Sequence, residues 1–227
     1  MAPESSPQWA GGFLGLLSPQ DRSDLLRLGH TRRYRADAYV IIQGDHSESV
    51  FLVTEGRVKV VVDTVDGHQV VLTVLGRGDV LGEFEAIDSN GGPRIASNVA
   101  LEPVECRALA GADFRRWIDS HPDASLALLK TIIRRLRAAD RRRTASGSLD
   151  ATHRLAAFLL EMVDQAGPDG TSDVDLALTQ EELAGLIASS RESVVRALAA
   201  LRARHLVSTA RRRITIVDVE GLRRFAG

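Results

Sequence analysis

Arginine, glutamate and serine side chains with a spacing suited to reading DNA bases occur together near the C-terminus. Arg191 and Arg196 are five residues apart, and Glu192 follows the first of them. An arginine can donate two hydrogen bonds to O6 and N7 of guanine, and a glutamate can accept one from N4 of cytosine. Ser190 and Ser193, with the free backbone N–H groups of a helix start, suit phosphate oxygens. This stretch predicts sequence-specific contact with double-stranded DNA.

Two short helices joined by a tight turn must position these side chains. Thr179 and Glu182 form a capping box that starts the first helix, and we place Thr179 and Gln180 at the DNA. The second helix is predicted at 190–203. Its apolar residues are expected to face a core, and they are Val194, Val195, Ala197, Leu198 and Leu201. This pattern is typical of a helix-turn-helix, although an ordinary amphipathic helix pair with a solvated charged face is the alternative.

A basic β-hairpin is predicted after the second helix. The apolar runs 206–209 and 214–217 flank Arg211, Arg212 and Arg213, which would form its tip. Such a tip suits backbone phosphates better than base edges. Together with the helix pair, the hairpin predicts a winged helix-turn-helix.

Composition is that of an ordinary globular protein. The chain has 227 residues, 44% of them hydrophobic, and a net charge of −1, so it is long enough for two small domains. The near-neutral total does not oppose DNA binding, because local charge decides it. Between Leu178 and Val217, seven arginines stand against three glutamates.

Other classes of protein are disfavoured. Cys106 is the single cysteine, so we expect neither a disulfide framework nor a multi-cysteine iron–sulfur cluster. The six histidines show no metal-ligand spacing, and we interpret His68 and Cys106 as structural residues. No nucleophile, base and acid gather in one motif, so we do not expect an enzyme. Without a secretion signal or a bilayer-length apolar run, we expect a cytoplasmic protein with no membrane partner.

The N-terminal half has the pattern of a β-structure. From Arg32 to about Ala108 the apolar residues alternate, with turn signals at regular intervals. The clearest unit is a hairpin predicted to turn on the two residues Asp66 and Gly67. Many short strands at this spacing favour a barrel or jelly roll.

A long helix is predicted to follow, beginning at residues 120–123. Its apolar residues have the 3-4-3 spacing of a coiled-coil seam, and they are Leu126, Leu129, Ile133 and Leu136. We expect a homodimer through the helix at 120–143; the alternative is a helix packed only on its own domain. The small polar run 144–148 is interpreted as a hinge.

The segment RESVVR, preceded by LTQEELAGLIASS, closely resembles the Crp/Fnr family of bacterial transcription regulators. The family pattern is Arg-Glu-Thr/Ser-Val-x-Arg, which residues 191–196 match in order. Ala188 stands where these regulators usually have glycine. The resemblance implies a homodimer on a palindromic, TGTGA-like site, RNA polymerase as a further partner, and a cyclic-nucleotide-binding type β-roll over about 13–118.

The resemblance also implies an effector site. In the family, a Gly-Glu pair binds the ribose, and an arginine followed by serine or threonine binds the cyclic phosphate. Gly82, Glu83 and Arg94 match these positions. Ile95 replaces the hydroxyl residue, and Glu85 replaces a small residue beside the phosphate.

The dimer helix would contribute Asp140 to this site, where the family has threonine or serine. Two interpretations stay open. Either Glu83 and Arg94 bind a cyclic nucleotide, or Arg94 forms an internal ion pair with Glu83 or Glu85. Because of Ile95 and Glu85, we expect absent, weak or altered binding of cyclic AMP, and the effector is unknown.

The predicted fold class is α+β, with an N-terminal cyclic-nucleotide-binding type β-roll (jelly roll), a long dimerisation helix and a C-terminal winged helix-turn-helix. The predicted domains are 1–119, 120–148 (dimerisation helix and hinge) and 149–227. The predicted function is that of a homodimeric, DNA-binding transcription regulator controlled through its N-terminal domain. The alternatives are a cyclic-nucleotide-binding module that regulates a partner or an enzyme without a DNA role, and a DNA-organising protein without an effector.

Overall fold

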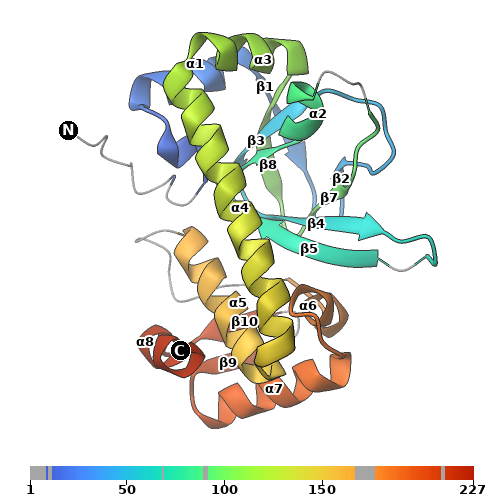
Figure 1. The fold of residues 1–227 in the computed structure, drawn as a ribbon, viewed down its shortest axis with the longest axis vertical. Helices are drawn as coiled ribbons and strands as arrows, with labels where there is room; N and C mark the ends of the chain where they lie inside the picture. Colours follow the sequence, from blue (N-terminus) through green and yellow to red (C-terminus); the bar gives the residue numbers. More distant parts are fainter. Residues whose placement is uncertain (1–8, 10–11, 68, 89–91, 167–176, 211–212) are drawn as a thin grey trace. The chain divides into compact units, whose positions relative to one another are not determined.

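The computed structural model describes residue 9 and residues 12–67, 69–88, 92–166, 177–210 and 213–227. Two compact units divide the chain: the first comprises 1–69 and 73–133, and the second comprises 134–227 together with 70–72. The first holds the β-roll and the second holds the helix-turn-helix with its hairpin (Figure 1). The predicted α+β fold class is confirmed.

Alternating apolar residues form the strands of two four-stranded sheets in the described part of the first unit. The strands are β1 (His30–Tyr34), β2 (Tyr39–Ile41), β3 (Val50–Glu55), β4 (Val58–Asp63), β5 (Gln69–Leu75), β6 (Val80–Leu81), β7 (Ser97–Ala100) and β8 (Val104–Leu109). One sheet has the order β1-β8-β3-β6 and the other β2-β7-β4-β5. The sheet core includes fully buried Val53, Val58 and Cys106.

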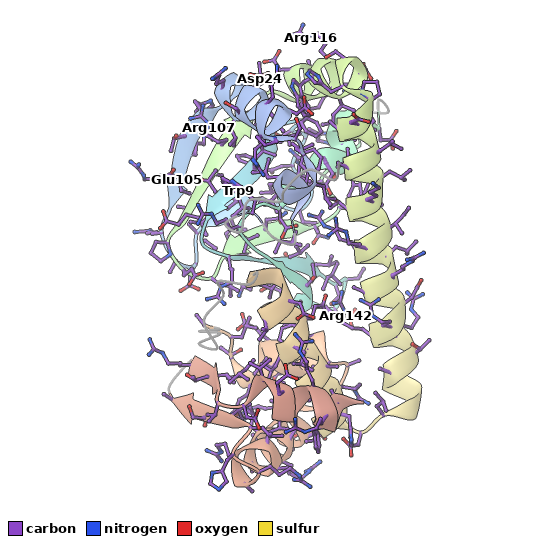
Figure 2. All side chains as sticks on the ribbon, turned by 90° about the vertical axis from the view of Figure 1, so that its left-hand side faces the viewer. Trp9, Asp24, Glu105, Arg107, Arg116 and Arg142 are labelled. Atoms are coloured by element: carbon purple, nitrogen blue, oxygen red, sulfur yellow. The ribbon has the colours of Figure 1, made fainter. Side chains whose placement is uncertain are left out.

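A second core lies beneath the helices of the same unit. It gathers residues of a 3-10 helix (Phe13–Leu16), α1 (Pro19–Leu28), α3 (Gly111–Ser120) and the start of α4. Ser18 caps α1, since Ser18 Oγ accepts from the N–H of Asp21 at 3.1 Å. Arg107 of β8 donates to the carbonyls of Leu26 and Gly29, which ties the end of α1 to the sheet (Figure 2).

β4 and β5 are neighbours in their sheet, as the predicted hairpin requires, but the predicted two-residue turn on Asp66 and Gly67 is wrong. β4 ends at Asp63 and β5 begins at Gln69. The turn closes earlier than Asp66, because the N–H of Gly67 donates to the carbonyl of Thr64 at 2.9 Å. Gly67 takes a left-handed φ of +79°, which glycine adopts without strain. β-branched Thr64 and Val65 made the strand pattern look longer than the strand is.

α4 (Pro122–Ser148) is longer than predicted, and residues 144–148, which we interpret as a hinge, belong to this helix. The N–H of Leu149 still donates to the carbonyl of Ala145 at 2.9 Å. The chain breaks at Leu149 and Asp150, where Asp150 Oδ1 accepts from the N–H groups of Thr152 and His153. The carboxylate of Asp150 thereby satisfies two free N–H groups at the start of the next helix.

The second unit packs around α5. Its helices are α5 (Ala151–Ala166), α6 (Gln180–Leu186), α7 (Arg191–Ala203) and α8 (Val219–Ala226), and its hairpin is β9 (Val207–Ala210) with β10 (Arg213–Ile216). Leu155, Phe158, Leu159 and Met162 of α5 are all buried. Arg142, in the last third of α4, pairs with Glu161 of α5 at 3.0 Å (Figure 2). Among the described helices, none is both long enough and apolar enough to span a bilayer.

Candidate DNA-reading face and effector site

The starts of α6 and α7 are both capped as predicted. Thr179 Oγ1 accepts from the N–H of Glu182 at 3.2 Å, and Glu182 Oε2 accepts from the N–H of Thr179 at 2.7 Å. Ser190 Oγ accepts from the N–H of Ser193 at 3.2 Å, which starts α7 one residue after Ser190. These local bonds set where the second helix begins, and therefore which of its side chains point outward.

The outer face of α7 carries the three predicted base-reading side chains. Arg191, Glu192 and Arg196 are exposed, whereas Val194, Ala197, Leu198 and Leu201 are buried as expected. The prediction that Val195 faces the core is wrong, because this residue is 43% exposed. Its position one helical turn after Arg191 places it on the charged face, away from the core stripe.

Hydrogen bonds hold the charged groups of this face. Arg196 Nη2 donates to Ser193 Oγ at 2.9 Å. Bonds from its own backbone N–H and from Ser190 lower the pKa of the Glu192 carboxyl below its ordinary value. Glu192 is therefore an ionised acceptor at neutral pH, as contact with the amine of cytosine requires.

Two neighbouring grooves bring most of the predicted DNA-contacting residues together. The larger, of about 530 Å³, is lined among others by Thr179, Gln180, Arg191 and Arg213. The smaller, of about 380 Å³, is lined by Arg191, Glu192, Val195 and Arg196. Arg191 thus borders both grooves. The predicted wing is present as β9 and β10, while Arg211 and Arg212 of its tip lie outside the described residues.

Arg154 of α5 is a residue that the sequence analysis missed. Its Nε donates to the carbonyl of Ile187 at 2.8 Å and its Nη2 to that of Ala188 at 3.2 Å. Its Nη1 donates to the carbonyl of Leu149 at 2.5 Å. One side chain therefore joins the end of α4 to the turn of the helix-turn-helix. No sequence motif marks it, because its two partners in that turn are backbone atoms more than thirty residues away.

Ala188 in that turn has a left-handed φ of +47°. An L-residue there costs about 1 kcal/mol relative to glycine, because its Cβ crowds the following carbonyl. We therefore expect Ala188→Gly to stabilise the helix-turn-helix by up to about 1 kcal/mol, measured as a higher urea midpoint. Exposed Ala139 of α4, with helical backbone, is the control position, where the same change is expected to destabilise. An unchanged or lower midpoint for Ala188→Gly would contradict the strain.

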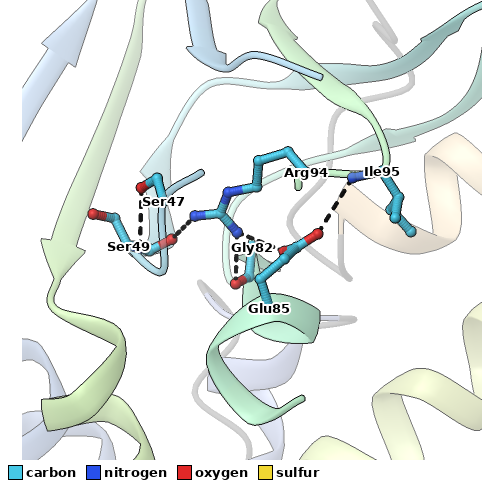
Figure 3. Close-up of polar contacts among 6 residues, drawn as sticks. All are labelled: Ser47, Ser49, Gly82, Glu85, Arg94 and Ile95. Carbon is cyan, nitrogen blue, oxygen red and sulfur yellow. Dashed lines mark hydrogen bonds and ion pairs between the residues drawn. The ribbon is translucent and has the colours of Figure 1, made fainter. Parts of the chain in front are cut away.

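Gly82 and Arg94 lie together in the first unit (Figure 3). Gly82 caps α2 (Glu83–Ile87) with a left-handed φ of +74°. A Cβ there would lie 2.7 Å from Arg94 Nη1 and 2.8 Å from the carbonyl oxygen of Ser49, so only glycine fits. The backbone of Arg94 is also fixed, since its N–H donates to the carbonyl of Asp45 at 2.9 Å.

The side chain of Arg94 is 2% exposed and pairs with Glu85, whose carboxylate lies 2.6 Å from Nη1. Arg94 Nη1 also donates to the carbonyl of Gly82 at 3.0 Å, and Nη2 donates to that of Ser49 at 2.5 Å. The sequence left Glu83 or Glu85 as the partner of an internal ion pair, and the pair with Glu85 is present in the structure. Figure 3 shows these bonds converging on the guanidinium group.

The other predicted effector residues differ in their surroundings. Glu83 is buried at 2% exposure, whereas Ile95 is 65% exposed. Asp140 is exposed and belongs to the second unit. Burial raises the pKa of the Cys106 thiol to about 12, so it stays protonated at neutral pH, and His68 lies outside the described residues. Among the described residues, no group of three or more histidine, cysteine or acidic side chains is arranged for a metal ion.

Two family models match the chain. The cyclic nucleotide-binding domain matches residues 31–121, and the Crp-like helix-turn-helix domain matches residues 153–225.

Relatives of the whole chain agree with these matches. The chain is 31% identical over 189 residues to a CRP-like cAMP-activated global transcriptional regulator of Mycobacterium tuberculosis, covering 82% of this chain and 84% of the relative. It is 30% identical to the cAMP-activated global transcriptional regulator Vfr of Pseudomonas aeruginosa, covering 81% and 87%. A CRP-family transcriptional regulator of Thermus thermophilus has a similar solved structure, with 26% identity, a TM-score of 0.68 and coverage of 86% and 96%.

Proposed function

Because the chain belongs to the Crp/Fnr family of transcription regulators, we propose that it is a homodimer that reads a palindromic DNA site with α7 of each protomer. The observation that carries this proposal is the exposure of Arg191, Glu192 and Arg196 on one face of a capped helix. Thr179, Gln180, Ser190 and Ser193 supply phosphate contacts at the starts of α6 and α7. The half-site resembles TGTGA.

The dimer forms through α4. Leu126, Leu129, Ile133 and Leu136 are 53%, 51%, 38% and 60% exposed, although all are large and apolar. The opposite face of the same helix buries Ala124, Ala127 and Leu128 in the core of the first unit. A second copy of the chain is the occupant that this stripe fits, because a coiled-coil seam is self-complementary about a two-fold axis.

The boundaries 1–119, 120–148 and 149–227 separate effector domain, dimerisation helix and DNA-binding domain. A signal in the first domain changes the spacing of the two reading helices through the break at Leu149 and Asp150, which Arg154 links to the helix-turn-helix. RNA polymerase is the protein partner, and the cytoplasm is the place of action.

The effector pocket is of the cyclic-nucleotide type but atypical. The residues that bind the ribose and the phosphate in the family are matched by Gly82, Glu83 and Arg94. The residue types differ from those of the family at Glu85, Ile95 and Asp140. Cyclic AMP, named for the relatives, is therefore expected to bind weakly or not at all. The effector is a cyclic nucleotide of another kind, or the site is regulated without one.

Arg213→Ala should weaken binding to all DNA sequences about equally. A wing arginine neutralises a phosphate, so its loss should reduce the slope of log affinity against log salt by about 1 without altering base preference. Fluorescence anisotropy on specific and scrambled duplexes measures this slope over a salt range of about 50 to 200 mM. A change in base preference would instead indicate that Arg213 contacts base edges in a groove of the DNA.

The proposal is tested by a gel shift with a duplex carrying two inverted TGTGA half-sites and with a scrambled duplex. The intact dimer should shift only the duplex that carries the two TGTGA half-sites. Equal retention of both would favour a DNA-organising protein, and retention of neither would favour an effector module that acts on another protein.

A further inference from the structure

We infer that Glu85 is a specificity determinant of the effector site, because its carboxylate supplies from within the chain the negative charge that a phosphate would bring to Arg94. This carboxylate opposes the binding of phosphate-bearing ligands at Arg94, cyclic AMP among them. This inference rests on the proposal that Gly82, Glu83 and Arg94 contribute to the effector site. It is independent of DNA binding.

The two oxygens of Glu85 take donors that an anion would use. Oε2 lies 2.6 Å from Arg94 Nη1, and Oε1 accepts from the N–H of Ile95 at 3.4 Å. The side chains of Glu85 and Arg94 are only 10% and 2% exposed. A phosphate brought to the same guanidinium would therefore lie close to a carboxylate with little water between them, where like charges repel strongly.

Arg94 is held in place by more than Glu85. The carbonyls of Gly82 and Ser49 accept from Nη1 and Nη2, and the main chain of Arg94 is bonded to Asp45. The guanidinium should therefore keep its position when Glu85 is neutralised. Arg94 Nε is also buried and has no hydrogen-bond partner in the described part of the chain, so a donor is already available to an incoming acceptor.

The test compares Glu85→Ala and Glu85→Gln with the natural chain by titration calorimetry, using cyclic AMP and inorganic phosphate as probes. Both variants remove the charge, and Glu85→Gln keeps the side-chain volume. We expect both to bind each probe about tenfold or more tightly than the natural chain does. Glu85→Ala combined with Arg94→Ala should abolish the gain. Glu48→Ala is the matched control, because it removes an exposed carboxylate that pairs with Arg115 in the same unit.

Glu85→Ala leaves a buried guanidinium without its counter-ion and is expected to be less stable. Its thermal midpoint should therefore rise with added phosphate, and that of the natural chain should not. Glu85→Gln supplies the binding measurement if Glu85→Ala does not fold.

The inference would be overturned if both neutral variants bound the probes no better than the natural chain. It would also be overturned by a gain in Glu85→Ala without one in Glu85→Gln, since shape would then be the cause, or by an equal gain in Glu48→Ala. Micromolar binding of cyclic AMP by the natural chain would contradict it directly. A failure of DNA binding would leave all of these results intact, because none of them uses DNA as the readout.

Discussion

Leu129→Asp should convert the dimer into monomers and lower the affinity for a two-half-site duplex by about 100- to 10,000-fold, the gain that bivalency provides. The stripe on α4 would bury four apolar side chains against their copies, and a carboxylate in its middle would be desolvated without a partner. Analytical ultracentrifugation measures the oligomeric state, and fluorescence anisotropy measures the affinity.

Lys130→Asp is the control for this prediction. Lys130 is the next residue of α4 and is exposed, but it lies off the apolar stripe. The Lys130→Asp variant should stay dimeric and lose only a small electrostatic part of its affinity for DNA. A monomeric natural chain, or a dimeric Leu129→Asp that binds the duplex normally, would remove α4 from the interface.

Arg191→Ala should have the second largest effect. An arginine that donates twice to guanine contributes about 1–3 kcal/mol of discrimination per half-site, and a two-fold dimer uses it twice. The variant should lose preference for its cognate guanine while keeping most of its affinity for unrelated DNA. Glu192→Ala should relax preference at a different base pair by a similar amount. Competition between duplexes with single-base changes measures both.

Arg224→Ala provides the matched control, since it removes an exposed arginine of the same unit from α8 and not from α7. It should leave base preference unchanged. If Arg191→Ala kept the full preference of the natural chain, α7 would not be the helix that reads the bases.

The parts of the site that depend on neighbouring residues could be predicted from the sequence. Thr179 with Glu182, and Ser190 with Ser193, are close along the chain, so their hydrogen bonds follow from local helix geometry. The apolar spacing of α5 and of the sheets likewise follows from burial of one face. Resemblance to a family added the role of these elements.

Features that depend on distant contacts could not be predicted. Arg154 bonds to backbone carbonyls of the turn between α6 and α7, and such acceptors exist at every residue. The apolar type of Val195 predicts a core residue, whereas its position one helical turn after Arg191 leaves it exposed. The small polar run 144–148 continues α4, and the carboxylate of Asp150 caps the start of the next helix.

The effector site lies between these cases. The sequence indicates which residues face one another, but choosing between Glu83 and Glu85 as the partner of Arg94 requires atomic positions. In the structure the choice depends on a distance of 2.6 Å between Arg94 Nη1 and Glu85. Ile95 could be recognised as a departure from the family, whereas its 65% exposure could not be foreseen from its apolar type.

The most direct test of the central claim is a selection of bound sequences from a pool of random DNA duplexes by the intact natural protein. The account predicts that the enriched sequences share an inverted repeat of TGTGA-like half-sites whose centres lie about one helical turn, roughly 10 base pairs, apart. Enrichment of no common sequence, or of a single half-site without its inverted copy, would contradict a dimer that reads DNA through two copies of α7.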